Sequence, residues 1–569
     1  MSLTGQMMKL MSLIGQSISK NVEKMSLEPF RYQEELLMSI LRDNADTEFG
    51  RAHGFADINS IEEFQNRVPV AEYDDYAPFI ERMVNGEENV LVSEHISHYN
   101  KTSGTLGLPK YIPLSEKQVS ICGKYHALHA NAVISKQIGY SWNNGKGINL
   151  AEGRAEVLES GATYGSASSV AVKGGPFKNI SSKIYTSPIE AKQPESGVIT
   201  RYMHARFALS ERKVTYIVAT FSSIIMEMFS YIEHNWEMLV RDIENGTIDD
   251  SVDLPDEVRA SLMKKIKPDP RRAAELRAAF KAGFDTPWAR RLWPKMQYMY
   301  SAGGANFAPY TEKLRKKVLG EDMPIFYFGV SASEGFFSTV YKMNDPQSIL
   351  TPDGCFMEFL DTDDENAPYL TMDKLEVGKC YELVITNFGG LYRYRMHDVF
   401  KVTGMHNRTP LIEFMNRAGY AANIRGEKTS EAAVRNAVSL TEKELGLDVV
   451  DFSIYPDPDG EAPTYVMFLE LNMKPGELGE GFDKEKIRSC LQKNLIASNT
   501  GLAKHFGEGH LAPIRLIILQ RETYMLYRDV MIMRGASASQ LKPLHVVRNE
   551  FQRKFLFKLD MENELAGLK

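Results

Sequence analysis

Hydrophobic and polar positions along the chain follow two spacings. Some stretches place an apolar residue at every third or fourth position, the period of a helix with one buried face, whereas others are apolar runs of strand length. Segments of the two kinds alternate, with no internal repeat and no low-complexity tract. This alternation predicts an α/β architecture in which helices flank β-sheets.

Four segments before residue 400 give individual predictions. Residues 323–329 and 380–387 are compact and apolar, so we expect strands whose ends carry the small or charged residues that follow. Residues 214–232 are strongly apolar but include Glu227, which predicts a buried strand and helix rather than a membrane span. Residues 253–295 are charge-rich, helical in pattern and punctuated by prolines, and predict a solvated helical insertion.

The pattern restarts after Arg417. Residues 430–445 are rich in Ala and Glu and predict a helix. Residues 450–454 and 464–471 are strand-like and follow it. We therefore expect a smaller α+β domain in this part of the chain.

The first 25 residues predict an amphipathic helix. They lack the long apolar core and the cleavage site of a secretion signal, and a mitochondrial transit peptide is the alternative. The apolar residues that recur at helical spacing are Met7, Met8, Leu10, Met11, Leu13 and Ile14.

The amino-acid composition limits the classes of partner that we expect for this chain. A chain of 569 residues is long enough for more than one domain, and its net charge of −7 carries no basic excess, so nucleic acid is not favoured. The four cysteines include no Cys-x-x-Cys pair, which argues against a zinc site or a disulfide framework and fits a reducing cytoplasm. We therefore expect small-molecule substrates. If the protein uses a metal ion, we expect the ion to bind together with a nucleotide.

Residues 102–110 have the composition of a loop that wraps a polyphosphate. Glycines let backbone N–H groups approach phosphate oxygens, hydroxyls add donors, and a lysine adds a positive charge. Pro109 separates the last glycine from the lysine, so this is not the loop of P-loop nucleoside triphosphatases. An ordinary polar turn is the alternative. The expected phosphate ligands are Thr102, Ser103, Gly104, Thr105, Gly107 and Lys110.

Two carboxylates follow predicted strands. Glu334 comes after the strand at 323–329, where it could hold Mg²⁺ that bridges phosphates; a surface acid at a strand end is the alternative. Asp398 follows the strand at 380–387, and its two oxygens suit the vicinal hydroxyls of a ribose. Its alternative role is to pair with a neighbouring arginine, either Arg393 or Arg395.

Taken together, these motifs resemble the adenylate-forming superfamily of acyl-CoA synthetases, luciferases and adenylation domains. Within it the chain is most similar to the acyl-acid amido synthetases typified by the plant auxin- and jasmonate-conjugating enzymes. The resemblance covers the chain from about residue 28. Further stretches that carry it are Val68-Pro69-Val70, Ile80-Glu81-Arg82-Met83, Glu233-His234-Asn235-Trp236, Gly426-Glu427-Lys428 and the C-terminal lysine loop Gly535 to Pro543.

The resemblance implies a reaction in two steps. ATP and a carboxylic acid form an acyl-adenylate and pyrophosphate, and an amine, usually an amino acid, then displaces AMP. ATP and Mg²⁺ are the implied cofactors. We also expect a cytoplasmic monomer without nucleic-acid or membrane partners. The implied domains are an ATP- and acyl-acid-binding domain over residues 1–417, a hinge at 418–425 and a mobile α+β domain over 426–569.

The resemblance also implies roles for single residues. Lys542 would be the catalytic lysine, with Lys428 as a second cation near the hinge. Ser333 and Asp398 would bind the nucleotide, Glu334 the metal, and Arg417 would be the hinge arginine of the nucleotide site. The acyl acid would meet Phe328, Val330 and Ser331, and the amine-acceptor region would comprise Thr163, Tyr164, Gly165, Ser166 and Ala167.

Four positions depart from the family pattern. Tyr420 stands where many hinges of the superfamily carry Asp or Lys. Leu106 replaces a hydroxyl residue of the phosphate loop, Val330 stands where a tyrosine often flanks adenine, and His397 occupies a usual glycine position before Asp398. None of these removes a residue on which the reaction must depend. Two alternatives stay open, an acyl-CoA ligase that ends with a thiol acceptor and a non-catalytic ligand-binding relative.

Overall fold

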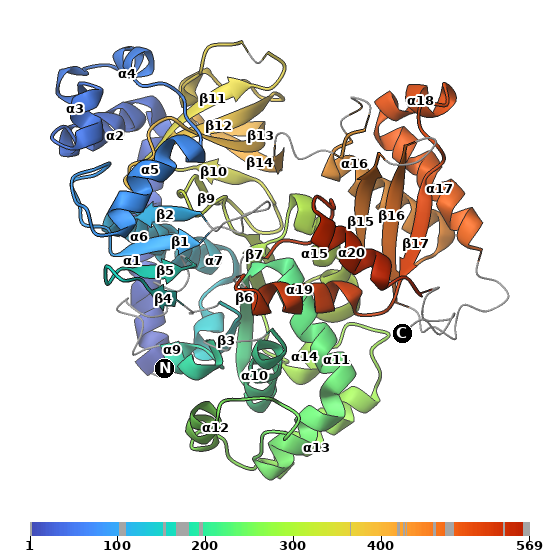
Figure 1. Cartoon of the computed structure of the whole chain (residues 1–569). Helices are drawn as coiled ribbons and strands as arrows, with labels where there is room; N and C mark the ends of the chain where they lie inside the picture. The colour runs from blue at the N-terminus through green and yellow to red at the C-terminus, as the bar shows by residue number, and fades with distance from the viewer. Residues whose placement is uncertain are drawn as a thin grey trace. The chain divides into compact units, whose positions relative to one another are not determined.

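The computed structural model describes residues 3–101, 110–151, 155–166, 181–192, 197–364, 366–417, 422–424, 427, 429–458, 463–472, 483–536, 538 and 541–561. Contacts within the chain divide it into two compact units. Described residues up to Phe414, with Ala536 and Ala538, form the first unit, and the other described residues from Met415 onward form the second. Figure 1 shows the elements of each unit in chain order.

Helices open the first unit and cover one of its sheets. Thr47 and Ser60 begin two of the helices by accepting hydrogen bonds from backbone N–H groups of the first turn. Leu37, Phe64 and Ile80 on these helices are at most 1% exposed and belong to the same buried cluster as the sheet. The helices are α1 (Leu3–Leu27), α2 (Pro29–Asp43), α3 (Glu48–Ala52), α4 (Ile61–Arg67) and α5 (Tyr73–Val84).

The predicted first helix forms, and of its predicted apolar residues Met11 is buried whereas three others are not. Leu10, Leu13 and Ile14 are about half exposed, at 57%, 51% and 47%. The buried face also includes small residues such as Ser12, which pairs with Ser135 at 3.0 Å. A Cβ on Gly15 would lie 2.0 Å from the carbonyl oxygen of Leu128. The helix therefore packs both through apolar side chains such as Val22 and Met25 and through a close backbone approach at Gly15.

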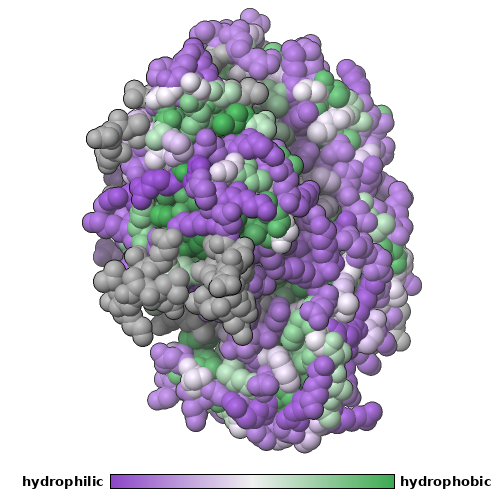
Figure 2. Space-filling model, turned by 90° about the vertical axis from the view of Figure 1, so that its right-hand side faces the viewer, coloured by the Kyte–Doolittle hydropathy of each residue, from purple (hydrophilic) through white to green (hydrophobic). Residues whose placement is uncertain are grey.

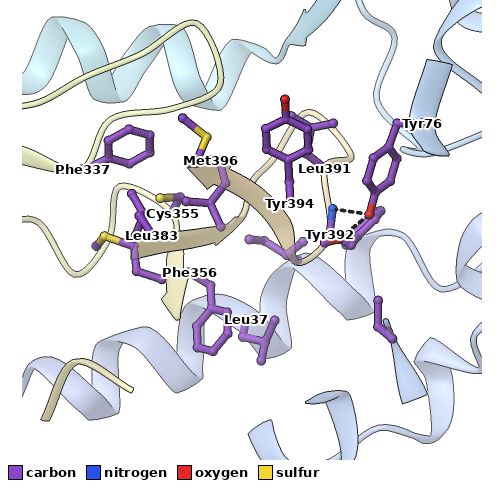
Figure 3. Packing of buried hydrophobic residues seen from close by; sticks show 14 of the residues in the cluster. Leu37, Tyr76, Phe337, Cys355, Phe356, Leu383, Leu391, Tyr392, Tyr394 and Met396 are labelled. Atoms are coloured by element: carbon purple, nitrogen blue, oxygen red, sulfur yellow. Dashed lines mark hydrogen bonds between the residues drawn. The ribbon is translucent and has the colours of Figure 1, made fainter. Parts of the chain in front are cut away.

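A six-stranded sheet with order β11-β12-β13-β14-β10-β9 packs against these helices (Figure 1). The pairs β11–β12 and β12–β13 are antiparallel. Figure 3 shows Phe356 on the sheet beside Leu37, and the hydroxyl of Tyr76 bonded to the backbone of Tyr392. The strands are β9 (Ser338–Val340), β10 (Ser348–Leu350), β11 (Phe356–Asp361), β12 (Cys380–Thr386), β13 (Tyr394–His406) and β14 (Thr409–Arg417).

A second sheet of the first unit is parallel, with order β3-β6-β7-β8. As predicted, residues 214–232 fold into a buried strand and a helix, and among the described residues no helix is both long and apolar enough to cross a bilayer. The elements are β3 (Lys146–Asn149), β6 (Val214–Phe221), β7 (Tyr298–Ala302), β8 (Ile325–Tyr327), α10 (Gly197–Ser210) and α11 (Ser222–Asn245).

Residues 253–295 are helical, but the prediction of a solvated insertion is wrong. The segment forms α12 (Asp256–Met263), α13 (Pro270–Lys281) and α14 (Ala289–Leu292). Leu276, Phe280, Trp288 and Trp293 from this segment are at most 3% exposed and join the core of the parallel sheet. Each helical turn in this segment contains charged residues beside the apolar ones, so the buried apolar face is not evident from the sequence.

A third, four-stranded sheet of the first unit has the order β2-β1-β5-β4. Its strands are β1 (His98–Lys101), β2 (Tyr111–Leu114), β4 (Ala155–Val157) and β5 (Thr163–Gly165). Strand β1 is antiparallel to β2 and parallel to β5. Helix α6 (Glu116–Cys122), a π-helical segment at Gly123–His129 and α7 (Ala130–Ile138) follow β2.

The second unit is a three-stranded sheet with helices on both faces. Successive side chains of β16 point to opposite faces, so Met467 packs with α16 and α17, while Phe468 packs with α19 and α20. Figure 2 shows a predominantly hydrophilic surface on the side that faces the viewer. The elements are β15 (Val449–Asp457), β16 (Thr464–Leu471), β17 (Arg515–Leu519), α16 (Glu431–Leu445), α17 (Lys484–Ser498), α18 (Thr500–Gly507), α19 (Thr523–Met533) and α20 (Glu550–Lys558).

A buried ion pair ties the six-stranded sheet to the N-terminal helices. Glu358 on β11 and Arg393, just before β13, are 0% and 6% exposed at their side chains and approach to 3.0 Å. Arg393 also donates hydrogen bonds of 2.8 Å to the carbonyl oxygens of Gln65 and Val68. One guanidinium therefore holds a strand and the end of α4 together.

We expect Glu358→Ala to destabilise the first unit by about 3–5 kcal/mol, because the variant leaves a buried guanidinium without its counter-charge. Urea unfolding combined with hydrogen exchange of amides in β11–β13 measures the change in this unit. Glu35→Ala, which removes an exposed partner of Arg31, is the matched control and should leave exchange in these strands unaltered. Equal exchange in both variants would contradict the role of the pair.

Candidate active site

Ser333 and Glu334 occupy the centre of a tight turn that follows β8. The N–H of Ala332 donates to the carbonyl oxygen of Gly335 at 2.9 Å, and the N–H of Gly335 donates back at 3.3 Å. Glu334 is 7% exposed. The carboxylate proposed as a metal ligand is thus carried on a short, hydrogen-bonded turn and is not a surface acid.

Three buried carboxamide side chains hold this turn. Asn100 of β1 donates to the carbonyl oxygen of Ser333 at 2.7 Å. Gln118 of α6 and Asn387, just after β12, donate to the carbonyl oxygen of Glu334 at 3.0 and 2.7 Å. All three amides are at most 4% exposed. Because buried amides strongly favour satisfied hydrogen bonds, these contacts fix the turn against three separate elements.

Asn387 also connects this turn to the next motif. Its Oδ1 accepts hydrogen bonds from the N–H groups of Gly389 and Leu391 at 2.9 and 3.0 Å. A Cβ on Gly389 would lie 2.3 Å from the carbonyl oxygen of Pro113, so the close approach requires glycine here. The turn at 332–335 and the turn before β13 therefore share one side chain.

Asp398 lies at a bulge inside β13. Glu382 pairs with Val399 and Val384 pairs with Arg395, so a two-residue step on β12 faces a four-residue step on β13. His397, the residue before Asp398, has a φ of 60°. Such a φ suits glycine, which explains the usual family residue at this position, and the bulge changes the direction in which side chains leave the strand.

The imidazole of His397 is held on both sides. Its Nε2 lies 3.0 Å from Glu72 and its Nδ1 lies 3.1 Å from Glu382. Burial alone would raise the pKa of Glu382, but hydrogen bonds from His397 and Arg395 outweigh it and lower the pKa to about 2. A charged Glu382 thereby holds the bulge that carries Asp398.

Each nearby arginine has a carboxylate partner other than Asp398. Arg393 pairs with Glu358, and Arg395 donates to Glu382 at 2.6 and 2.9 Å.

Two lysines mark the limits of the predicted phosphate loop, Lys101 just before it and Lys110 as its last residue. Lys101 ends β1 and pairs in register with Tyr111 of β2, and Lys110 lies directly before β2. The Nζ of Lys110 stands 4.6 Å from the ring centroid of Tyr73. Residues 102–109 lie outside the described part of the chain, and with them Thr102, Ser103, Gly104, Thr105 and Gly107 of the predicted ligands and the variant Leu106.

The predicted amine-acceptor segment lies beside these lysines. Because β5 runs parallel to β1, with Asn100 opposite Gly165, both strands end at the same edge of the sheet. The rings of Tyr164 and Tyr111 lie 4.5 Å apart between centroids and are tilted by 39°, and the Nζ of Lys101 lies 5.2 Å from the Tyr164 ring. The hydroxyl of Thr163 forms a 2.7 Å hydrogen bond with the Nδ1 of His98. Ser166 is 2% exposed. Ala167 lies outside the described residues.

Two buried polar atoms in this region lack a partner among the described residues. They are the Oδ1 of Asn100 and the hydroxyl of Tyr164, on neighbouring strands β1 and β5. Buried polar atoms are seldom left unpaired. Their position at the edge where the phosphate loop begins fits a site that receives a polar ligand.

Phe328 joins a group of aromatic residues that sequence reasoning missed. Its ring lies 4.1 Å from Tyr300 and 5.0 Å from His126, and His126 lies 4.9 Å from Phe336. Burial lowers the pKa of His126 to about 4, so its imidazole is neutral near pH 7. These residues come from segments about 200 residues apart, and no local pattern in the sequence links them.

The other two predicted acyl-acid residues are not part of this group. Val330 packs against the cluster formed with the six-stranded sheet, and Ser331 is exposed. The structure therefore brings Phe328 to the aromatic group and leaves Val330 and Ser331 beside the turn at 332–335.

The remaining predicted residues belong to the second unit. Arg417 is the last residue of β14, and Lys542 is exposed. Lys428 lies outside the described residues.

Family comparisons cover nearly all of these elements. The GH3 family N-terminal domain matches residues 18–324, the central domain of that family matches residues 348–417, and its C-terminal domain matches residues 432–550. The chain belongs to the GH3 family. The predicted family is confirmed, and with it the class of enzyme, an amide-forming ligase.

GH3 relatives align with this chain along most of its length. Jasmonoyl-L-amino acid synthetase JAR4 of Nicotiana attenuata is 28% identical over 93% of this chain and 92% of its own. Indole-3-acetic acid-amido synthetase GH3.8 of Oryza sativa subsp. indica is 28% identical over 92% of this chain and 89% of its own. The solved structure of the GH3.15 acyl acid amido synthetase superposes with a TM-score of 0.85 at 24% identity and covers 96% of both chains, which confirms the predicted fold class.

The carboxamides around the GH3 turn at 332–335 give a direct prediction. In Asn387→Asp an oxygen replaces the donor that faces the carbonyl of Glu334, while Oδ1 still accepts from Gly389 and Leu391. We expect a loss of about 1–3 kcal/mol in stability and a raised Mg²⁺ requirement, measured by thermal unfolding and a metal titration of activity.

Asn366→Asp is the control, because Asn366 is an exposed turn residue of the same unit. Wild-type values of both quantities in Asn387→Asp would show that this amide does not position Glu334.

Proposed function

We propose that this GH3 protein is an ATP-dependent acyl acid amido synthetase. It adenylates a carboxylic acid with release of pyrophosphate and then transfers the acyl group to the amine of an amino acid. The observation that carries the proposal is the bond from Asn100 to Ser333, because Asn100 stands two residues before the predicted phosphate loop and Ser333 stands beside the predicted metal ligand. One buried amide therefore couples the two parts that must meet the same triphosphate.

Chemically, the donor set suits a nucleotide. Lys110 and the loop at 102–109 would bind phosphates, Ser333 would add a donor, and the carboxylate of Asp398 would accept hydrogen bonds from the ribose hydroxyls. The unpaired Oδ1 of Asn100 supports a polar ligand at this edge. Arg417, the last residue of β14, would also bind the nucleotide.

Glu334 would provide a protein ligand to Mg²⁺, which supplies positive charge to the phosphate oxygens when it is bound. Among the described residues no group of three His, Cys, Asp or Glu side chains could hold a metal ion by itself.

Adenylation needs the leaving pyrophosphate and the α-phosphate to be stabilised as charge builds on them. Lys542 would bring an ammonium group to these oxygens, with Lys428 as a second cation, and both belong to the segment that we propose to be mobile about a hinge at 418–425. In the second step an amine attacks the acyl carbonyl carbon, the bond to the phosphate oxygen breaks, and AMP leaves. Positive groups aimed at developing charge lower the barrier most in a site that excludes water.

The acid and the amine would approach from different elements. The aromatic group of Phe328, Tyr300 and His126 would contact the hydrophobic body of the acid, with Val330 and Ser331 nearer its carboxylate, and a neutral His126 suits an uncharged ring or chain. The amine would enter at residues 163–167, beside the end of β1. JAR4 and GH3.8 are named for a jasmonoyl and an indole-3-acetic acid substrate, each joined to an amino acid, which supports this substrate class.

A cytoplasmic monomer that acts on small molecules, with neither nucleic acid nor a membrane as partner, completes the proposal. All four cysteines are free, as a reducing compartment favours. The net charge of −7 gives no general attraction to nucleic acid.

ATP–pyrophosphate exchange with a panel of acids tests the first step, with jasmonic acid, indole-3-acetic acid and substituted benzoic acids as probes. AMP release that depends on an amino acid and not on coenzyme A tests the second. Exchange without amine-dependent AMP release would favour an acyl-CoA ligase, and no exchange with any acid would favour a non-catalytic relative.

Glu334→Gln removes the charge of the predicted metal ligand while it keeps the size of the side chain. We expect the Mg²⁺ concentration for half-maximal exchange to rise by at least about 10-fold, since even outer-shell partners of a metal cost that much when lost. Glu376→Gln, an exposed acid of the same unit, is the control. An unaltered metal titration would contradict the role of Glu334.

Asp398→Ala should weaken nucleotide binding by about 10- to 100-fold, because it removes charge-assisted hydrogen bonds to the ribose, while binding of the acid changes little. Isothermal titration calorimetry with ATP and with the acid in separate experiments gives both values. Asp363→Ala, at an exposed turn after β11, serves as the reference variant. Equal losses for both ligands would point to a general structural defect.

A further inference from the structure

A buried histidine of the second unit lies three residues after Lys542. His545 is 2% exposed, and its Nδ1 lies 2.6 Å from Glu431 while its Nε2 lies 3.2 Å from Asp451. Its ring stacks on Phe452 with 4.3 Å between centroids and 4° between planes. Both ring nitrogens therefore face carboxylates, and the ring is held flat between α16 and β15.

These contacts require the charged form of the imidazole. Both nitrogens can donate to carboxylates only when both carry a proton. Burial alone would lower the pKa of His545, but the bonds to Asp451 and Glu431 raise it to about 9. Burial alone would raise the pKa of Glu431, but the hydrogen bond from His545 and the positive charges of His545, Arg435 and Lys542 lower it. The ammonium group of Lys542 therefore acts on the same carboxylate that His545 binds.

The segment around His545 is attached to β15 by an isolated β-bridge between Ile454 and Val546. The N–H of Ile454 donates to the carbonyl oxygen of His545 at 2.8 Å, and the N–H of Val547 donates to Ile454 at 2.9 Å. The hydroxyl of Ser453 donates to the carbonyl oxygen of Leu544. Lys542 is exposed and precedes the first of these attachments by two residues, so its backbone is anchored while its side chain reaches solvent.

A buried charged cluster is a costly way to hold a loop. Well-packed apolar residues of similar volume stabilise a fold as well as or better than a buried ion pair, so stability does not explain the arrangement. Hydrogen bonds are directional, so contacts from one ring to two elements fix the position of that ring. The imidazolium of His545 is bonded to α16 and to β15, and it therefore fixes the position of the loop at 541–547 relative to both elements.

We propose that His545 is a positioning residue for Lys542: by joining the loop at 541–547 to Glu431 and Asp451, it sets where the lysine ammonium is presented during adenylation. The inference rests on the proposed function, since it takes Lys542 as the lysine of that step. It assigns no role to His545 in the transfer of the acyl group to the amine.

His545→Gln tests the proposal through the two half-reactions, measured with the acid that gives the fastest exchange in the panel above. A misplacement of about 1 Å costs up to 100-fold in rate, so we expect maximal ATP–pyrophosphate exchange to fall about 10- to 100-fold. The KM values for ATP and acid should stay within about 3-fold. Aminolysis of the chemically synthesised acyl-adenylate of that acid should keep its wild-type rate, whereas a general folding defect would slow both reactions.

Lys542→Ala and the double variant Lys542→Ala/His545→Gln show whether the histidine acts through the lysine. If it does, the double variant exchanges no more slowly than Lys542→Ala alone, because the second change has nothing left to misplace. Additive losses would overturn the inference. His510→Gln is the matched control, since His510 is an exposed histidine of the same unit with a carboxylate neighbour.

Failure of the inference and failure of the proposed function give different results. Unchanged exchange in Lys542→Ala contradicts the role of the lysine itself. A strong loss in Lys542→Ala with full exchange in His545→Gln contradicts the positioning role alone. If His545→Gln does not fold, Glu431→Gln, which keeps the size of the side chain and leaves Asp451 as counter-charge, decides: reduced exchange in a folded variant supports the proposal, and wild-type exchange overturns it.

Discussion

The pair formed by Glu358 and Arg393 is the constraint on which the first unit depends. It places a guanidinium where β12 turns back into β13, and the same guanidinium holds the carbonyl groups at the end of α4. The turn that it fixes carries Asn387 at one end and leads to the bulge of Asp398 at the other. One buried charge pair therefore links the strand pairing of the sheet to the helix that packs on it, next to the segments that carry two site residues.

Elements with a clear local signal could be predicted from the sequence. The strand at 464–471 has the predicted bounds because every one of its residues is buried, so its apolar run is continuous. The helix at 430–445 begins one residue later than predicted because Ser430 caps it. Packing faces were harder to predict. The first helix buries its small residues, and the helices between 253 and 295 hide an apolar face among charges, since in both cases the partner surface decides which side is buried.

The candidate site likewise contains some residues that the sequence could indicate and others that it could not. Glu334, Asp398 and Lys110 carry chemistry that spacing and family resemblance can indicate, and the glycine usual before Asp398 corresponds to a positive φ that the strand requires. The amides of Asn100, Gln118 and Asn387 gave no such signal, because each acts on a turn that is 53 to 233 residues away in the chain. His545 is a similar case: its partners lie 94 and 114 residues away, and only the folded unit brings two carboxylates to one ring.

The close approach of the first helix at Gly15 limits how this protein can vary. A longer side chain at Gly15 would push against the backbone of Leu128, two residues from His126 in the π-helical segment that contributes to the aromatic group. The opposite side of the helix, with Leu10, Leu13 and Ile14, faces solvent and bears no such restriction. Substitutions on the solvent-facing side of this helix should therefore be tolerated. On the side that carries Gly15, the size of a side chain is limited by the π-helical segment, whose His126 contacts Phe328.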